Sequence, residues 1–249
     1  MGNIIVRETS AELRGIGRNA LNGAWGQVAI ACFLYYVMIA TVPSVLSLFI
    51  PASIYLGESV PGMDLSISYV SYLYSAVMTG VFQLGLVIFI LTFLRTRKTN
   101  SAVIFNGFEY FAKAFCISFM SAFFAAMWTL LFIIPGIIAY IRYSQALYIL
   151  ADDPRKGVFQ CINESKYLMT GNKAKFFCMN LSFIGWTILA NLPIMLFPFT
   201  VPGWLAIIVD LVLSIPYFFL LAYVEVTNGI FYELVTGHLV AKRVERPAA

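Results

Sequence analysis

Long apolar stretches alternate with short polar segments along the whole chain. Six of these stretches approach or exceed the ~20 helical residues that cross the ~30 Å hydrocarbon core of a bilayer. They cover residues 25–49, 68–94, 113–134, 136–151, 175–197 and 203–224. Backbone polar groups inside a bilayer must be hydrogen-bonded within the protein, so each stretch is expected to be a helix. The pattern predicts an all-α fold, a polytopic transmembrane helical bundle in which residues 1–249 form a single integral membrane domain.

The fourth stretch is the shortest of the six. Residues 136–151 extend only about 24 Å at 1.5 Å per residue, which is less than the hydrocarbon thickness. The preceding Pro135-Gly136 pair either forms a tight turn between two spans or kinks one very long helix. A crossing fourth segment keeps the basic segments of the chain on one side of the membrane, and this favours six spans.

Three polar segments that precede the odd-numbered spans carry apolar residues at helical spacing. They predict amphipathic helices lying in the membrane interface, at residues 10–24, 101–112 and 154–171. Thr9 and Glu12 have the spacing of a capping box before the first helix. Asp153 is expected to cap the third.

The basic residues indicate how the spans are oriented. They gather near the N-terminus and at 95–98, 155–175 and 242–246, whereas the segment between the first two spans carries Glu58 and Asp64. On the positive-inside rule the basic segments and both termini are cytoplasmic. Their expected partners are anionic lipid headgroups and not nucleic acid, because no continuous basic face is present.

Composition excludes a soluble protein and offers no signal of an enzyme. The residues are 61% hydrophobic and 11% charged, against about 45–50% and about 25% in soluble domains. No HExxH, GxSxG or glycine-rich phosphate loop is present. The four cysteines show no disulfide or metal-site spacing. We therefore expect no enzymatic activity, no cofactor and no metal.

Two charged residues are predicted to lie inside the membrane. Arg142 follows the turn at 135–136 by about six residues, or roughly 9 Å, and Asp210 lies at a similar depth in the sixth span. A charge there needs a partner or water, so the two are expected to pair. With Tyr143 and Asn191 they form a candidate intramembrane polar site. The pair either fixes the packing of two helices or contributes to a substrate or proton site.

Two segments carry a resemblance to a known family. The chain reads IPGIIAYIRYSQALYILADDP from Ile134 and INESKYLMTGNKAKFFCMNLSFIGW from Ile162. They resemble a family of bacterial integral membrane proteins, domain of unknown function 975, which is distantly similar to the membrane domain of some glycerophosphodiester phosphodiesterases. The resemblance implies the same fold and a bacterial cytoplasmic (plasma) membrane, and it implies no activity.

Two hypotheses for function follow. The first is a non-enzymatic accessory component that binds a membrane protein partner through a cytoplasmic motif, formed by Asp152, Asp153, Ser165, Gly171, Asn172 and Lys173. The second is a transporter of a small molecule or lipid, with a polar cavity around Arg142 and Asp210.

Overall fold

A computed structural model describes residues 4–50, 53–60, 63–97, 100–196 and 203–238. The basic tail at 242–246 lies outside the described residues. Six helical segments are long and apolar enough to cross a membrane, as the sequence predicts. They are Trp25–Phe49, Tyr69–Thr96, Ser101–Leu131, Ile133–Asp152, Lys173–Leu196 and Ile215–Thr236.

Most of these segments are built from more than one element. The first comprises α2 (Trp25–Tyr36), a π-helical turn η1 (Val37–Thr41) and α3 (Val42–Phe49), and the second is α4 (Tyr69–Thr96). The third joins a 3₁₀ helix, η2 (Ser101–Tyr110), to α5 (Phe111–Leu131), and the fourth comprises α6 (Ile133–Tyr143) and α7 (Ala146–Asp152). The remaining elements are α1 (Ser10–Leu21), α8 (Val158–Leu168), α9 (Lys173–Leu181), α10 (Ile184–Leu196), α11 (Gly203–Leu213) and α12 (Ile215–Thr236).

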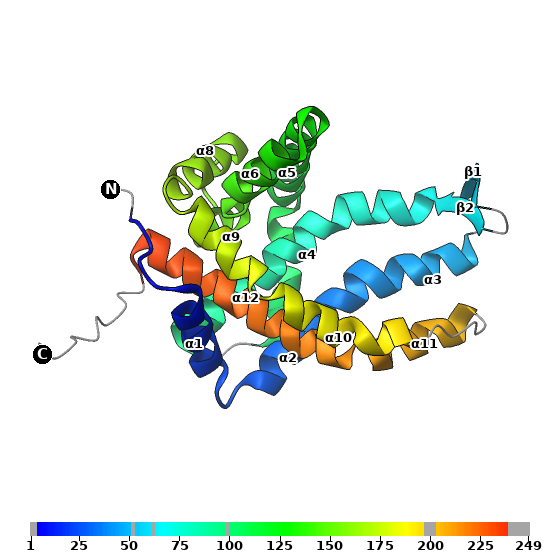
Figure 1. Ribbon diagram of the computed structural model, residues 1–249, viewed down its shortest axis with the longest axis horizontal. Coiled ribbons are helices and arrows are strands. Elements are labelled where there is room, and N and C mark those ends of the chain that lie inside the picture. Colours follow the sequence, from blue (N-terminus) through cyan, green and yellow to red (C-terminus); the bar gives the residue numbers. More distant parts are fainter. Residues whose placement is uncertain (1–3, 51–52, 61–62, 98–99, 197–202, 239–249) are drawn as a thin grey trace, which may run out of the picture.

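The helices form an elongated bundle with one diverging arm (Figure 1). α3, α4, α10, α11 and α12 run along the long axis, while α5 and α6 form a hairpin that leaves the bundle at an angle. The N-terminal segment and α1 lie at one end of the long axis. An antiparallel hairpin of β1 (Ser53–Val60) and β2 (Met63–Ser68) lies at the other end. These short strands were not predicted from the sequence, but every membrane-length segment is helical.

The turn between the third and fourth segments differs in detail from the prediction. It was expected at Pro135-Gly136, but the chain breaks at Phe132, whose backbone is extended, and α6 already begins at Ile133. Pro135 therefore lies in the first turn of α6, where the missing N–H of proline costs no helical hydrogen bond. Gly136 packs tightly against Thr129 of α5, which closes the hairpin.

The segment before the first span packs against the bundle. Thr9 and Glu12 form the predicted capping box, with hydrogen bonds in both directions. Leu13 and Leu21 on its apolar face are fully buried, against α12 and α9. A Cβ added to Gly17 would lie 2.5 Å from Oγ1 of Thr227 in α12, so this crossing requires a glycine. Much of the face expected to meet lipid is therefore covered by protein.

The other two short helices also pack onto neighbouring helices. η2 lies in backbone contact with α4, because Gly85 of α4 faces the carbonyl of Ile104. α8 begins at Val158 and not near residue 154, with Gly157 at its N-cap. The expected cap by Asp153 does not form, since its carboxylate accepts a hydrogen bond from the backbone of Arg155 instead.

The last membrane-length helix lies further along the chain than the sequence suggested, over Ile215–Thr236 and not residues 203–224. α11 and α12 follow each other with a break at Ser214, beside Pro216, and α12 continues to Thr236 instead of ending near 224. Helical hydrogen bonds run through the break, from Ser214 to Asp210 and from Phe218 to Ser214. The extension places Glu225 within a helix that packs against α1, α2 and α4.

Candidate functional site

A cavity of about 840 Å³ lies where the α5–α6 arm diverges from the bundle. Side chains from α2, α4, α5, α6, α7, α9 and α12 line it. Its wall is largely apolar, with residues such as Ile117, Ala125 and Phe176. The polar groups come from distant parts of the sequence, and Glu225 of α12 is the one charged side chain among the lining residues that the structure describes. We call this space the Glu225 cavity.

The Glu225 carboxyl group is surrounded by neutral polar groups. Gln83 of α4 hydrogen-bonds to it, and the Tyr35 hydroxyl of α2 donates to Oε1 of Gln83 at 2.6 Å. Tyr148 of α7 lies beside the same carboxyl group. Three helices therefore converge on one carboxyl group, without a basic side chain among the lining residues.

Two polar atoms at the cavity have no hydrogen-bond partner in the described structure. They are Oγ of Ser121 and Oδ1 of Asn228, and both are buried. Buried polar atoms are nearly always paired, since an unpaired one costs about 1–3 kcal/mol. The presence of two at one cavity indicates a place where a bound group would complete the hydrogen bonds.

A helix break borders the cavity. α6 ends at Tyr143 and α7 begins at Ala146. Ser165 of α8 bridges the break, because its hydroxyl donates to the Arg142 carbonyl at 2.7 Å and accepts from the backbone N–H of Gln145 at 3.2 Å. Interrupted helices at membrane depth require such a partner for their freed backbone groups.

The structure separates the residues of the predicted intramembrane site. Arg142 and Asp210 form no ion pair, because α6 and α11 belong to different parts of the bundle. Asp210 instead accepts a hydrogen bond from the Tyr36 hydroxyl at 2.9 Å. Asn191 donates to a carbonyl of its own helix, outside the cavity. Tyr143 alone of the four lines the Glu225 cavity.

Part of the predicted cytoplasmic motif holds the N-terminal segment in place. Gly171 has a positive φ of 82°, which favours glycine and turns the chain after α8. The side chain of the buried Asn172 accepts from the N–H of Val6 at 2.9 Å and donates to the carbonyl of Ile4 at 2.9 Å. It also donates to Leu168 at 2.8 Å. This amide therefore ties residues 4–6 to the end of α8.

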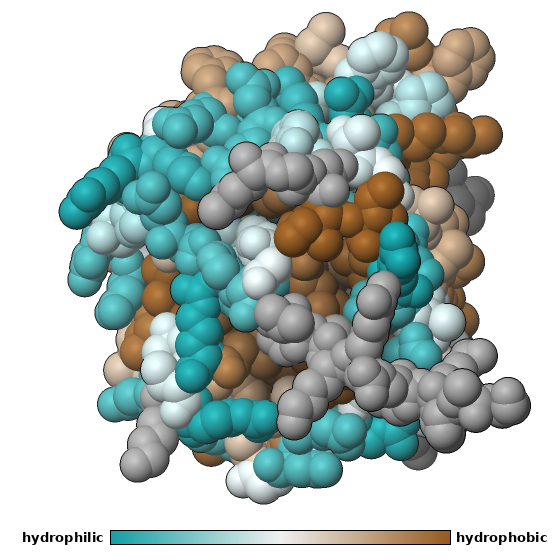
Figure 2. All heavy atoms as spheres, turned by 90° about the vertical axis from the view of Figure 1, so that its left-hand side faces the viewer, coloured by the Kyte–Doolittle hydropathy of each residue, from teal (hydrophilic) through white to brown (hydrophobic). Residues whose placement is uncertain are grey.

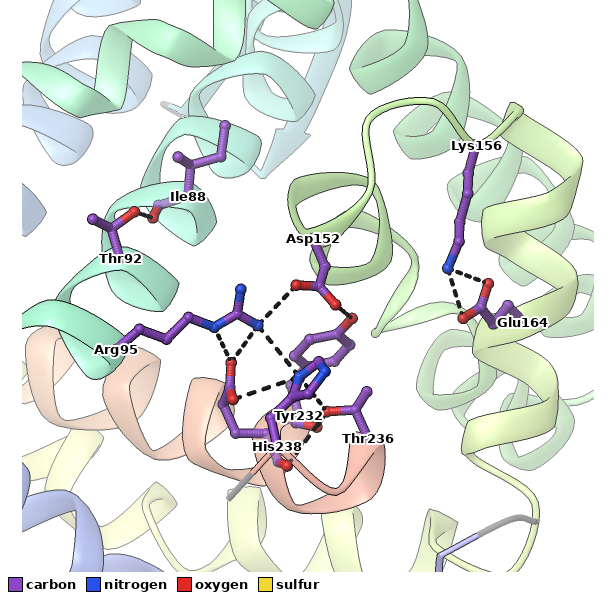
Figure 3. Close-up of polar contacts among 10 residues, drawn as sticks. Ile88, Thr92, Arg95, Asp152, Lys156, Glu164, Tyr232, Thr236 and His238 are labelled. Carbon is purple, nitrogen blue, oxygen red and sulfur yellow. Dashed lines mark hydrogen bonds and ion pairs between the residues drawn. The ribbon is translucent and has the colours of Figure 1, made fainter. Parts of the chain in front are cut away.

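Asp152 belongs to a polar group at the ends of three helices, the Arg95 cluster, formed by Arg95, Asp152, Tyr232, Glu233 and His238. Figure 3 shows these contacts. Arg95 at the end of α4 contacts Asp152 of α7 at 2.8 Å and Glu233 of α12 at 2.7 Å. The Tyr232 hydroxyl donates to Asp152 at 3.2 Å. The cluster joins α4, α7 and α12. Lys173, the last residue of the predicted motif, begins α9.

The span that the sequence predicts over residues 203–224 ends just before Glu225. The structure shows instead that Glu225 lies inside a helix and faces the cavity. The sequence did carry one signal of a polar site at Glu225. Asn228 follows it by three residues, and residues three apart lie on one helix face. Among the described residues no group of three His, Cys, Asp or Glu is placed to hold a metal ion.

The comparisons with known proteins support the family resemblance over part of the chain. The model of a family described as Protein of unknown function (DUF975) matches residues 129–238. This range contains Glu225, Asn228 and the interrupted fourth segment. No curated protein and no solved structure matches the chain. The similarity to glycerophosphodiester phosphodiesterases therefore stays a prediction.

Proposed function

We propose that this chain is a non-enzymatic protein of the bacterial plasma membrane that binds a small molecule or lipid in the Glu225 cavity and moves it across the bilayer. The observation that carries the proposal is a carboxyl group that lines a cavity of about 840 Å³, with the unpartnered polar atoms of Ser121 and Asn228 on the same cavity wall. Intramembrane ionisable groups are costly and are most often kept for function.

The proposed topology has six spans and both termini in the cytoplasm. The end that carries the N-terminus and α1 is covered to a large extent by hydrophilic residues (Figure 2). Arg14, Arg18 and Arg95 belong to elements at or near this end, in agreement with the positive-inside rule. We further propose that η2 lies in the headgroup region, because Phe105 and Phe108 are exposed on its surface.

The interrupted fourth segment supports movement of a ligand as well as binding. Transporters commonly bind substrate beside a discontinuous helix, and Tyr143 and Tyr148 on either side of the break line the cavity. The lining residues within the described chain include no histidine, cysteine or lysine that would pair with a serine as nucleophile and base. We therefore propose a carrier and no catalyst.

The proposal of an accessory protein that binds a membrane partner is the weaker one. Three residues of the predicted motif have internal contacts: Asp152 pairs with Arg95, and Ser165 and Asn172 are fully buried. Their side chains are occupied in holding this chain together, which leaves less of the motif to meet another protein.

A pair of tryptophan variants tests whether the cavity holds a ligand. Ala122 lines the cavity on α5, whereas the neighbouring Phe123 is 50% exposed and does not line it. Native mass spectrometry of protein extracted from bacterial membranes should show a bound small molecule on the parent chain and on Phe123→Trp. Ala122→Trp, which fills the cavity, should lose it. Equal adducts on both variants, or none on the parent chain, would contradict the proposal.

A further inference from the structure

We infer that the cavity takes an amphiphile with a primary ammonium group, whose ammonium lies between Glu225 and Asn228 and whose hydrocarbon chain lies along the α5–α6 side. The inference rests on the proposed function, because it names the class of ligand for the same site. Three observations support it: the cavity has polar atoms without a hydrogen-bond partner, its lining residues in the described chain include no basic side chain, and its wall is largely apolar.

The unpartnered oxygen of Asn228 requires a hydrogen-bond donor from the ligand. Oδ1 of Asn228 is a carbonyl oxygen, which only accepts hydrogen bonds, and it is buried without a partner. Glu225 is three residues earlier on α12, so the two side chains share one helix face. Both line the cavity. A primary ammonium group carries three donors and no acceptor, so it matches two adjacent acceptors, with the Ser121 hydroxyl as a further acceptor.

The charge of the site also favours a cation. The other ionisable side chains that line the cavity in the described chain are those of Tyr35, Tyr140, Tyr143 and Tyr148. Phenols are uncharged at neutral pH. A carboxylate in apolar surroundings therefore has no protein counter-charge here, and a ligand ammonium would supply it.

The same charge argument excludes a phosphate from the ligand. No arginine, lysine or histidine is among the lining residues in the described chain. A phosphodiester brought into the cavity would be a second anion beside Glu225, without a basic partner. The ligand is therefore a phosphate-free amine and not the headgroup of a zwitterionic or anionic phospholipid.

The apolar part of the cavity is open at its rim. Ile137 of α6 and Phe177 of α9 are 43% and 42% exposed and line the cavity. Exposed apolar residues on a membrane-length helix are expected to face lipid acyl chains. A hydrocarbon chain therefore passes along this rim, with its ammonium group at Glu225.

The test is calorimetric titration of the full chain in phosphatidylcholine nanodiscs with n-decylamine, n-decanol and decanoate. We expect saturable binding of decylamine only, at one site per chain, above non-saturable partitioning of all three. Glu225→Gln should weaken decylamine binding by at least about tenfold. Asp210→Asn, which neutralises the carboxylate outside the cavity, should bind as the parent does. Asn228→Leu keeps the volume, removes the acceptor and should also weaken binding, so it serves if Glu225→Gln does not fold.

Several results would overturn the inference. These are unchanged decylamine binding in Glu225→Gln or in Asn228→Leu, decanol bound as tightly as decylamine, and competition by phosphatidylethanolamine when it replaces phosphatidylcholine. If decylamine does not bind but the parent chain still carries an adduct that Ala122→Trp removes, the cavity binds another class of ligand. The proposed function then stands and the ammonium inference fails.

Discussion

Arg95 offers a sharp test of how the helix ends are held together. Replacing it by methionine removes the cation between α4, α7 and α12 while keeping much of the side-chain volume. The two carboxylates left behind differ in exposure: the side chain of Glu233 is 4% exposed and that of Asp152 is 23% exposed. The loss of stability in Arg95→Met should therefore come mainly from Glu233, whose less exposed carboxylate no longer has its arginine partner.

The magnitude follows from that difference. A solvent-exposed ion pair contributes about 0–1 kcal/mol, whereas removing one partner of a buried pair costs about 3–5 kcal/mol. The Arg95 side chain is 40% exposed, and Nδ1 of His238 lies 3.6 Å from Oε2 of Glu233. Water and the His238 ring therefore both reduce the free-energy cost of removing Arg95. We expect Arg95→Met to lower the free energy of unfolding by about 2–3 kcal/mol.

The assay is reversible unfolding in mixed micelles by titration with sodium dodecyl sulfate. The double variant Arg95→Met, Glu233→Gln also removes the carboxylate that Arg95→Met leaves without its arginine partner. It should recover most of the lost free energy of unfolding. Asp152→Asn serves as the matched control at the more exposed carboxylate, with an expected loss of about 1 kcal/mol or less. The reasoning is refuted if the double variant is as unstable as Arg95→Met, or if Asp152→Asn costs as much.

Three further predictions concern other contacts. Asn172→Ala should cost about 1–3 kcal/mol by removing three hydrogen bonds, and the amide of Val6 should exchange its hydrogen faster; unchanged exchange would contradict the role of Asn172. Gly85→Ala should disrupt the α4–η2 crossing and reduce folded yield in size-exclusion chromatography, while Gly15→Ala, which meets no atom within 4 Å, should not; equal yields would contradict the crossing. Burial raises the pKa of the Cys161 thiol, partly offset by Lys156, so maleimide labelling should be slow at neutral pH and rise with pH; fast labelling at neutral pH would contradict that burial.

Hydropathy and local signals were sufficient to predict six membrane-length helices and the first helix cap, although not the bounds of the sixth helix. Each apolar stretch is a local property of the chain, since the bilayer requires every spanning segment to satisfy its own backbone. Thr9 and Glu12 interact across one turn, so their spacing alone predicts the capping box. The helix start near residue 158 was missed because Asp153 hydrogen-bonds to the backbone of Arg155 and does not cap the helix.

The site could not be predicted in the same way, because it depends on contacts between distant residues. The carboxyl of Glu225 meets Gln83, which is 142 residues earlier in the chain, and no local pattern joins them. The predicted pairing of Arg142 with Asp210 used depth alone, and depth does not specify which helices are neighbours. Likewise, the break after Tyr143 is stabilised by Ser165 on another helix, so only the folded structure shows it.

The most direct test of the Glu225 cavity uses a cysteine inside it. Ser121→Cys is placed in a chain whose exposed Cys116 and Cys178 are replaced by serine, and its modification rates by 2-aminoethyl and 2-sulfonatoethyl methanethiosulfonate are compared. A cavity with an unpaired carboxylate predicts faster modification by the cationic reagent, with a preference that Glu225→Gln removes. No modification by either reagent, or a preference that survives Glu225→Gln, would contradict the account.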